Sequence, residues 1–110
     1  MSSYLIQVSY STEALRSLIK NPQNRSEVVR KSVEKLGGKL VGLWLSFGDY
    51  DVVVVAEMPD NVKAAALSLA VAAGGTAKSV KTTPLLSVEE GIAALKKAGN
   101  TGYKPVGAKK

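Results

Sequence analysis

Four consecutive valines, Val52 to Val55, constrain the fold of this chain more than any other feature. A strand with one face in water alternates apolar and polar residues, whereas this run is apolar on both faces. Gly48 and Asp49 form a turn before the run, and Pro59 and Asp60 end it. The pattern predicts a strand in the middle of a sheet, with apolar cover on both sides.

Two more strands are predicted before the valine run. Residues 4–10 alternate between two faces, and the apolar side chains are Tyr4, Ile6, Val8 and Tyr10. Residues 39–47 form a second strand, which the turn at Gly48 joins to the valine run as a hairpin. Strict alternation would place Leu40, Gly42 and Trp44 on one face of this strand.

Helices are predicted in the intervals between the strands. A short helical turn over residues 11–16 precedes a helix that Asn21 and Pro22 are expected to start. Asp60 is the expected N-cap of a third helix over residues 62–73. Because this third helix is apolar nearly all round, we expect it to have two neighbours.

An edge strand and a final helix complete the pattern. The strand is predicted over Ala77 to Leu85. An edge position suits its two lysines and its proline, Lys78, Lys81 and Pro84, because these residue types are favoured at sheet edges. Ser87 to Glu90 is a capping box that starts the final helix. The apolar residues that we expect to face inward from this helix are Val88, Ile92 and Leu95.

The order of these elements predicts an α+β fold, a ferredoxin-like βαββαβ plait with a four-stranded antiparallel sheet and an extra C-terminal helix. Right-handed crossovers place the first and third strands in the middle of the sheet. We expect one domain over residues 1–98 and a basic, flexible tail over residues 99–110, with lysines at Lys104, Lys109 and Lys110.

Both main helices of such a plait cover the same face of the sheet, which leaves the other face bare. That face would expose Val53 and Val55, or Val52 and Val54 in the other register. Covering apolar surface is favourable by about 25 cal/mol per Å². We therefore expect a second copy of the chain on this face, in a homodimer or a larger assembly built from dimers.

The composition excludes several kinds of chemistry. The chain has no histidine and no cysteine, which rules out Ser-His-Asp, Cys-His and zinc sites. The pairs Gly37-Gly38 and Gly74-Gly75 follow helices, whereas a phosphate-binding loop precedes one. We expect no cofactor and no metal.

The net charge of +6 raises the question of a nucleic-acid partner, but the tail supplies part of it and aromatic residues make up only 5% of the chain. RNA-binding plaits stack bases on aromatic residues of the central strands, where this chain has valines. We therefore do not expect nucleic acid as a partner. No apolar run is long enough to cross a bilayer and no secretory signal is evident, so a cytoplasmic location is expected.

Several motifs together resemble the GYD domain family. They are Leu36 to Leu40, Gly48 to Val53, Glu57 to Asp60, and Thr82-Thr83 followed by Ser87 to Glu90. The family motif Gly-x-Tyr-Asp is matched by Gly48, Tyr50 and Asp51, and the resemblance covers about residues 4–95. It implies a small oligomeric ferredoxin-like protein and no particular reaction. Ala14 to Arg16 departs from the family, in which many members have a glycine.

Tyr50 and Asp51 are the first candidate site residues, since a phenol and a carboxylate could bind or deprotonate a small ligand. The alternative is that they build the hairpin. Neighbouring strand residues face opposite sides of the sheet, which disfavours a catalytic Tyr-Asp pair. No catalytic residue is identified.

A second candidate group lies on several strands and contains Trp44, Gln7, Ser9, Asp51 and Lys81. An aromatic ring with a few polar groups suits a ligand pocket, and it equally suits a partly polar dimer interface. Arg25 is the third candidate, either as a clamp for an anionic ligand or as part of a structural ion pair.

Two functions follow from this sequence. The first is a homo-oligomeric small-molecule-binding protein with a pocket near the sheet, which could be a cofactor-independent enzyme. The second is an interaction module that self-assembles through the open sheet face without catalysis. A ligand-filled pocket at Trp44 would distinguish the first from the second.

Overall fold

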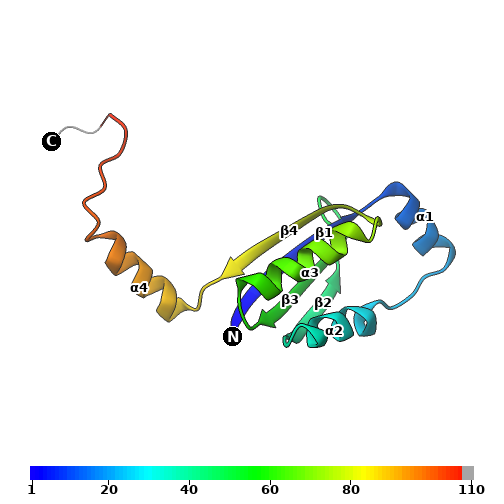
Figure 1. The fold of residues 1–110 in the computed structure, drawn as a ribbon. Helices are drawn as coiled ribbons and strands as arrows, with labels where there is room; N and C mark the ends of the chain where they lie inside the picture. Colours follow the sequence, from blue (N-terminus) through cyan, green and yellow to red (C-terminus); the bar gives the residue numbers. More distant parts are fainter. Residues whose placement is uncertain (108–110) are drawn as a thin grey trace.

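A computed structural model describes residues 1–107, and it has the predicted ferredoxin-like α+β plait (Figure 1). The strands are β1 (Ser2–Tyr10), β2 (Lys39–Leu45), β3 (Val52–Met58) and β4 (Ala77–Leu85). The helices are α1 (Thr12–Lys20), α2 (Ser26–Lys35), α3 (Asn61–Ala73) and α4 (Val88–Ala98). Lys109 and Lys110 of the predicted tail lie outside the described residues.

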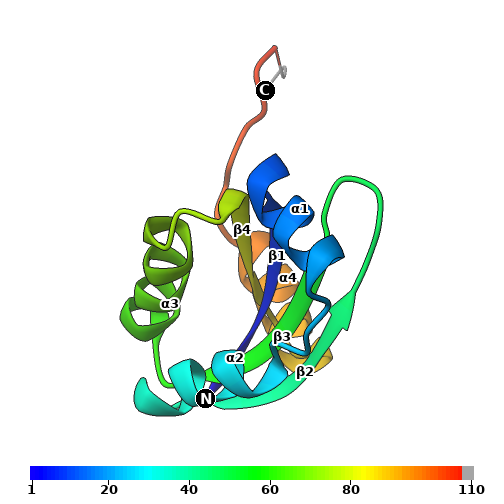
Figure 2. The same cartoon turned by 90° about the vertical axis from the view of Figure 1, so that its right-hand side faces the viewer.

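The four strands form one antiparallel sheet in the order β2-β3-β1-β4. The two central strands are therefore β1 and β3, as predicted, and β4 is an edge strand. Figure 2 shows that α2 and α3 lie on the same side of the sheet. α2 packs on β2, and α3 packs on β4 and β3.

The hydrophobic core lies between the sheet and these two helices. Its buried side chains are Tyr4, Ile6, Val8, Val33, Leu40, Val52, Val54, Ala56, Met58, Ala64 and Leu67. Burying one aliphatic side chain of this size is worth about 1.5–3 kcal/mol, so this layer dominates the stability of the domain. Polar contacts tie the layers together, among them a hydrogen bond from the Tyr4 hydroxyl to Asn61 Oδ1.

The strand register decides which valines belong to the core. Val54 lies opposite Ile6, and both side chains are buried beneath the helices. Val53 lies opposite Gln7 on the other face, where both side chains are half-buried. The open face therefore carries Val53 and Val55, which decides between the two registers that the sequence allowed.

The prediction for Leu40 is wrong because β2 contains a bulge. Leu40 pairs with Ala56, whereas Gly42 pairs with Val55, so Val41 is an extra residue on β2. An extra residue reverses the alternation of side chains on either side of it. Leu40 is thus buried under the helices, while Gly42 and Trp44 belong to the open face.

The predicted start of the second helix at Asn21 is also wrong. α1 is longer than the expected turn, and Asn21 ends it by donating its backbone N–H to the Ser17 carbonyl. α2 begins only at Ser26, whose N–H donates to Asn24 Oδ1 at 2.9 Å. Asn24 thus supplies an oxygen acceptor at the start of α2, and residues 21–25 form the connection.

Asp60 is the N-cap of α3, as predicted, and accepts a hydrogen bond from the Lys63 N–H. The sheet covers one side of this helix, where Ala64 and Leu67 are buried. Val62 and Leu69 on its outer side are mostly exposed. Within residues 1–107 the expected second neighbour of α3 is therefore missing.

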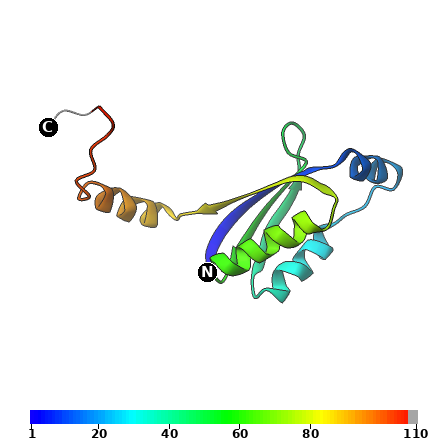
Figure 3. The ribbon, with the colours of Figure 1, turned by 45° about the horizontal axis from the view of Figure 1, so that its top comes forward.

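The capping box of α4 is formed as predicted, with Ser87 and Glu90 bonded to each other's backbone N–H. The helix nevertheless does not pack on its own domain but projects beyond the end of β4 (Figures 1 and 3). The inward orientation expected for its apolar side chains is wrong, since Val88 and Leu95 are 80% and 74% exposed. The two-residue link, Leu86 and Ser87, leads the helix away from the sheet.

This projecting helix extends the molecule well beyond a compact domain. The radius of gyration is 17.8 Å, compared with about 13 Å for a compact domain of 100 residues. None of the helices in the described part of the chain combines the length and apolar character of a membrane span.

Candidate functional site

The open face of the sheet, on the side away from α2 and α3, carries most of the candidate residues. We use the name open face for the outward side chains of the four strands. They are Ser3, Leu5, Gln7, Ser9, Lys39, Gly42, Trp44, Val53, Val55, Glu57, Ser79, Lys81, Thr83 and Leu85. Its central rows are largely apolar, with Val53, Val55 and Leu5 side by side.

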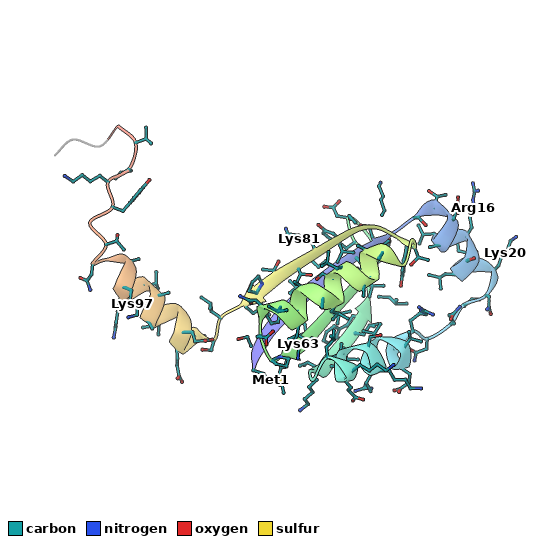
Figure 4. The ribbon with its side chains drawn as sticks, viewed as in Figure 1. Met1, Arg16, Lys20, Lys63, Lys81 and Lys97 are labelled. Carbon is teal, nitrogen blue, oxygen red and sulfur yellow. The ribbon has the colours of Figure 1, made fainter. Side chains whose placement is uncertain are left out.

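Three of the candidates lie in one row across the four strands. Trp44 pairs with Val53, Val53 with Gln7, and Gln7 with Lys81. Lys81, labelled on β4 in Figure 4, and Trp44 on β2 stand at opposite edges of the sheet. Three strand spacings of about 4.8 Å separate them by roughly 14 Å. The row thus spans a broad surface, wider than one compact pocket.

Trp44 lies over Gly42 on the open face. A Cβ atom added to Gly42 would lie 2.5 Å from an indole carbon of Trp44, so only glycine leaves room for the ring in this position. The Trp44 side chain remains 53% exposed. β2 therefore presents a large aromatic surface to solvent.

Asp51 joins the ends of the two central strands. Its carboxylate accepts a hydrogen bond from the Tyr10 N–H at 2.8 Å, and its own N–H donates to the Val8 carbonyl at 2.8 Å. The Ser46 N–H donates to the Asp51 carbonyl. These contacts support the structural interpretation, in which Asp51 closes the hairpin.

Tyr50 lies in the turn between β2 and β3, and Ser9 at the end of β1 is hydrogen-bonded to this turn. The Tyr50 carbonyl accepts a hydrogen bond from the Ser46 hydroxyl at 2.7 Å, and the Ser9 hydroxyl donates to the Asp49 carbonyl at 2.7 Å. Gly48 has φ +129°, a conformation that side chains disfavour. The Gly-x-Tyr-Asp motif therefore builds the turn that places β3 beside β1.

Arg25 lies apart from the row on the open face. It is exposed at the start of α2, close enough to Tyr10 for its charge to act on the phenol. Burial raises the pKa of Tyr10, Asp51 adds to the increase, and the Arg25 guanidinium opposes it. The ion pair suggested for Arg25 is not formed among residues 1–107, where Arg30 and Glu27 form the single ion pair, at 3.2 Å.

Two shallow depressions lie elsewhere on the surface. One follows α1 and the other follows α4, and neither includes Trp44, Tyr50 or Asp51. No three acidic side chains in the described part of the chain come together as a metal site. Apart from the Tyr4 phenol, whose hydroxyl donates to Asn61 Oδ1, the side chains buried among residues 1–107 are apolar.

Sequence reasoning missed two exposed apolar surfaces, the outer side of α3 and the stripe along α4. It identified these residues as apolar but assigned them to the interior of the chain. The sequence does hold a signal for the exposed stripe of α4, which is Gly91. A glycine inside a helix lowers helix stability, so its presence suggests that another molecule approaches the helix closely at this position.

Two comparisons relate the chain to known proteins. The GYD domain model matches residues 4–95. A protein of Thermus thermophilus named "Glutamine synthetase and cystathionine beta-lyase binding protein" is 28% identical to this chain over 96 residues. The similarity covers 87% of this chain and 100% of that relative.

Proposed function

The chain belongs to the GYD domain family, and from this premise we propose that it is a self-assembling interaction module without catalytic activity. Two copies join through their open faces, and the assembled unit binds a partner protein. The observation that carries the proposal is the continuous apolar surface formed by Trp44 with Val53, Val55 and Leu5.

The make-up of the open face supports a protein partner. Tryptophan is enriched among the residues that contribute most to protein interfaces, and Trp44 is large and 53% exposed. Polar and charged side chains such as Lys81 and Glu57 lie around the apolar centre, which resembles the polar rim of an interface. A second copy presents the same surface and therefore fits a two-fold contact.

The name of the Thermus relative suggests what the assembled unit binds. That protein is named for binding glutamine synthetase and cystathionine beta-lyase, and its whole length is covered by the similarity. By analogy, we propose a metabolic enzyme as the partner of this chain. Glutamine synthetase and cystathionine beta-lyase are the first two to test.

Native mass spectrometry of the purified full chain tests the self-assembly. The expected result is a dimer or a multiple of it at micromolar concentration, without a bound small molecule. A matched pair of variants assigns the contact to the open face: Val53→Asp is expected to lose this contact and give a smaller assembly, whereas Lys31→Asp on the exposed side of α2 is expected to assemble normally. A wild-type monomer would overturn the proposal.

Isothermal titration calorimetry tests the partner. The two enzymes, taken from the organism of this chain, are titrated with the assembled protein, and binding of at least one is expected. If neither binds, the proposed partner is wrong, while the test of self-assembly stands independently.

A small-molecule site is the second candidate function, because one row brings the Trp44 ring, the Gln7 amide and the Lys81 ammonium onto the same face. Facing sheets of two copies would enclose these groups and complete a pocket that a single chain lacks. The same mass spectra distinguish this function, since a co-purified ligand would add a defined mass to the dimer.

A further inference from the structure

The apolar stripe of α4 has no cover among residues 1–107. Val88, Ile92 and Leu95 follow one side of the helix at the spacing of an amphipathic helix. Together with Leu86 they line a shallow apolar depression, and Ile92 is still 47% exposed. The short link after β4 leads α4 away from the sheet (Figures 1 and 3).

Gly91 lies in the middle of this stripe, and no contact in the described part of the chain requires a glycine there. Its φ is not positive, and a Cβ atom added to it would meet no atom within 4 Å. A glycine within a helix is less favourable than alanine for helix stability. Close approach of another molecule is the remaining physical reason for a glycine at this position.

The pattern of α4 is complementary to itself in the antiparallel direction. If two copies align about a centre at residue 93, Leu95 of each comes opposite Gly91 of the other, so that a large side chain meets a gap. In the same alignment Glu89 comes beside Lys96 of the second copy. Acidic residues in the first turn and basic ones in the last also suit the dipole of each single helix.

We infer that α4 pairs in an antiparallel arrangement with α4 of a second copy of this chain, with Gly91 receiving Leu95 from the partner helix. This contact uses a different surface from the open face, so it goes beyond the proposed function. A chain with two separate two-fold contacts assembles beyond a dimer, into a closed tetramer or an open series of copies. The full-length protein is therefore expected to form an assembly of four copies or a larger even number.

Single cysteines test the pairing directly, because the chain contains no cysteine of its own. In the antiparallel pair, residue 92 lies close to residue 92 of the partner helix. Ile92→Cys is therefore expected to form a disulfide between copies under mild oxidation, as judged by non-reducing gel electrophoresis. A disulfide requires Cα atoms within about 7 Å of each other.

Two matched controls define the geometry. Ala93→Cys lies at the same height on the opposite side of the helix and is expected to cross-link at least ten-fold more slowly. Val88→Cys lies on the apolar side, but in the antiparallel pair the two copies of residue 88 are about 15 Å apart along the axis, from a rise of 1.5 Å per residue. Rapid cross-linking at Val88 would overturn the antiparallel arrangement, and none at Ile92 would overturn the pairing.

Gly91→Leu tests the role of the glycine. Leucine favours the helix and enlarges its apolar surface. If α4 associated only through non-specific hydrophobic contact, this variant would therefore associate more strongly. Filling the gap that receives Leu95 is instead expected to weaken the tetramer at least ten-fold in dilution experiments, leaving dimers. Unchanged or stronger assembly would overturn the inference.

The variants separate this inference from the proposed function. Val53→Asp breaks the open-face contact and is expected to leave the Ile92→Cys cross-link intact, whereas Gly91→Leu is expected to leave the open-face dimer intact. If Ile92→Cys fails to cross-link while the protein remains a dimer, the α4 pairing alone is wrong. If cross-linking persists and no open-face dimer forms, the proposed function alone is wrong.

Discussion

The two faces of the sheet are built from the same four strands, yet the chain seals only one of them. On the sealed face, Val54 and Ile6 lie under α2 and α3 and are almost fully buried. On the open face, Val53 and Val55 come from the same valine run and remain half-buried. Side chains of one type thus reach two different environments by a shift of one residue.

This difference teaches that an unbroken apolar strand predicts two covered faces, but does not indicate whether the same chain or another molecule covers each one. A strand beside solvent usually alternates, and the valine run does not. The chain provides helices for one side only, and the composition of the other side fits a protein contact. The following predictions change each face in turn, from the largest expected effect to the smallest.

Val54→Asp is expected to unfold the protein. Val54 is 4% exposed, and an unpaired charge there costs several kcal/mol out of a typical total of about 5–15 kcal/mol. Circular dichroism would show loss of the native spectrum and of the cooperative melting transition. A folded Val54→Asp protein would contradict the assignment of this residue to the sealed face.

Val53→Asp places the same change one residue away and is expected to leave a folded protein that no longer pairs through its open face. The charge can be hydrated in the free chain but must be buried in the dimer, which weakens self-association by about 3 kcal/mol or more, or at least 100-fold. Analytical ultracentrifugation measures this change. Unfolding equal to that of Val54→Asp would show that the two faces do not differ.

Gly48→Ala is expected to destabilise the hairpin that sets the register of both faces. Space is available for the methyl group, but φ +129° costs a residue with a side chain about 1–3 kcal/mol. The melting temperature should fall by several degrees. The matched control Gly91→Ala, at a helical glycine outside the sheet, is expected to leave the melting of the domain unchanged.

Gly42→Ala is expected to have the smallest effect on stability, below about 1 kcal/mol, because the exposed Trp44 ring can move aside. The added methyl group displaces the ring from its place over β2. Trp44 is the single tryptophan, so its fluorescence reports this movement alone. Self-association is expected to weaken several-fold, and an unchanged dimer would argue against Trp44 as an anchor.

Much of the fold is predictable from sequence because local signals agree with one another. The valine run, the turn at Gly48 and the cap at Asp60 each act within a few residues, and all three are found as predicted. The bulge at Val41 is not predictable in this way, because it depends on which residues of β3 bond across to β2. Side-chain alternation alone therefore assigned Leu40 to the wrong face.

The candidate site was predictable to a smaller extent. Gln7, Trp44 and Lys81 were proposed to share a face, and the strand register places them in one row. The neighbourhood of Tyr10 and Arg25 joins elements distant in sequence, so no local pattern indicates it. For α4, periodicity identifies the apolar side but not the molecule that covers it, and the inward orientation was wrong.

The length of α4 has a consequence for what can stand beside this protein. Eleven residues rise about 16 Å along the helix axis. A protein attached to the C-terminal end of α4 is therefore held at a fixed distance from the sheet. Lengthening α4 by one turn would add about 5 Å to that separation and would rotate the attached body about the helix axis by only a small angle. The spacing between attached bodies can therefore be changed by changing the length of α4.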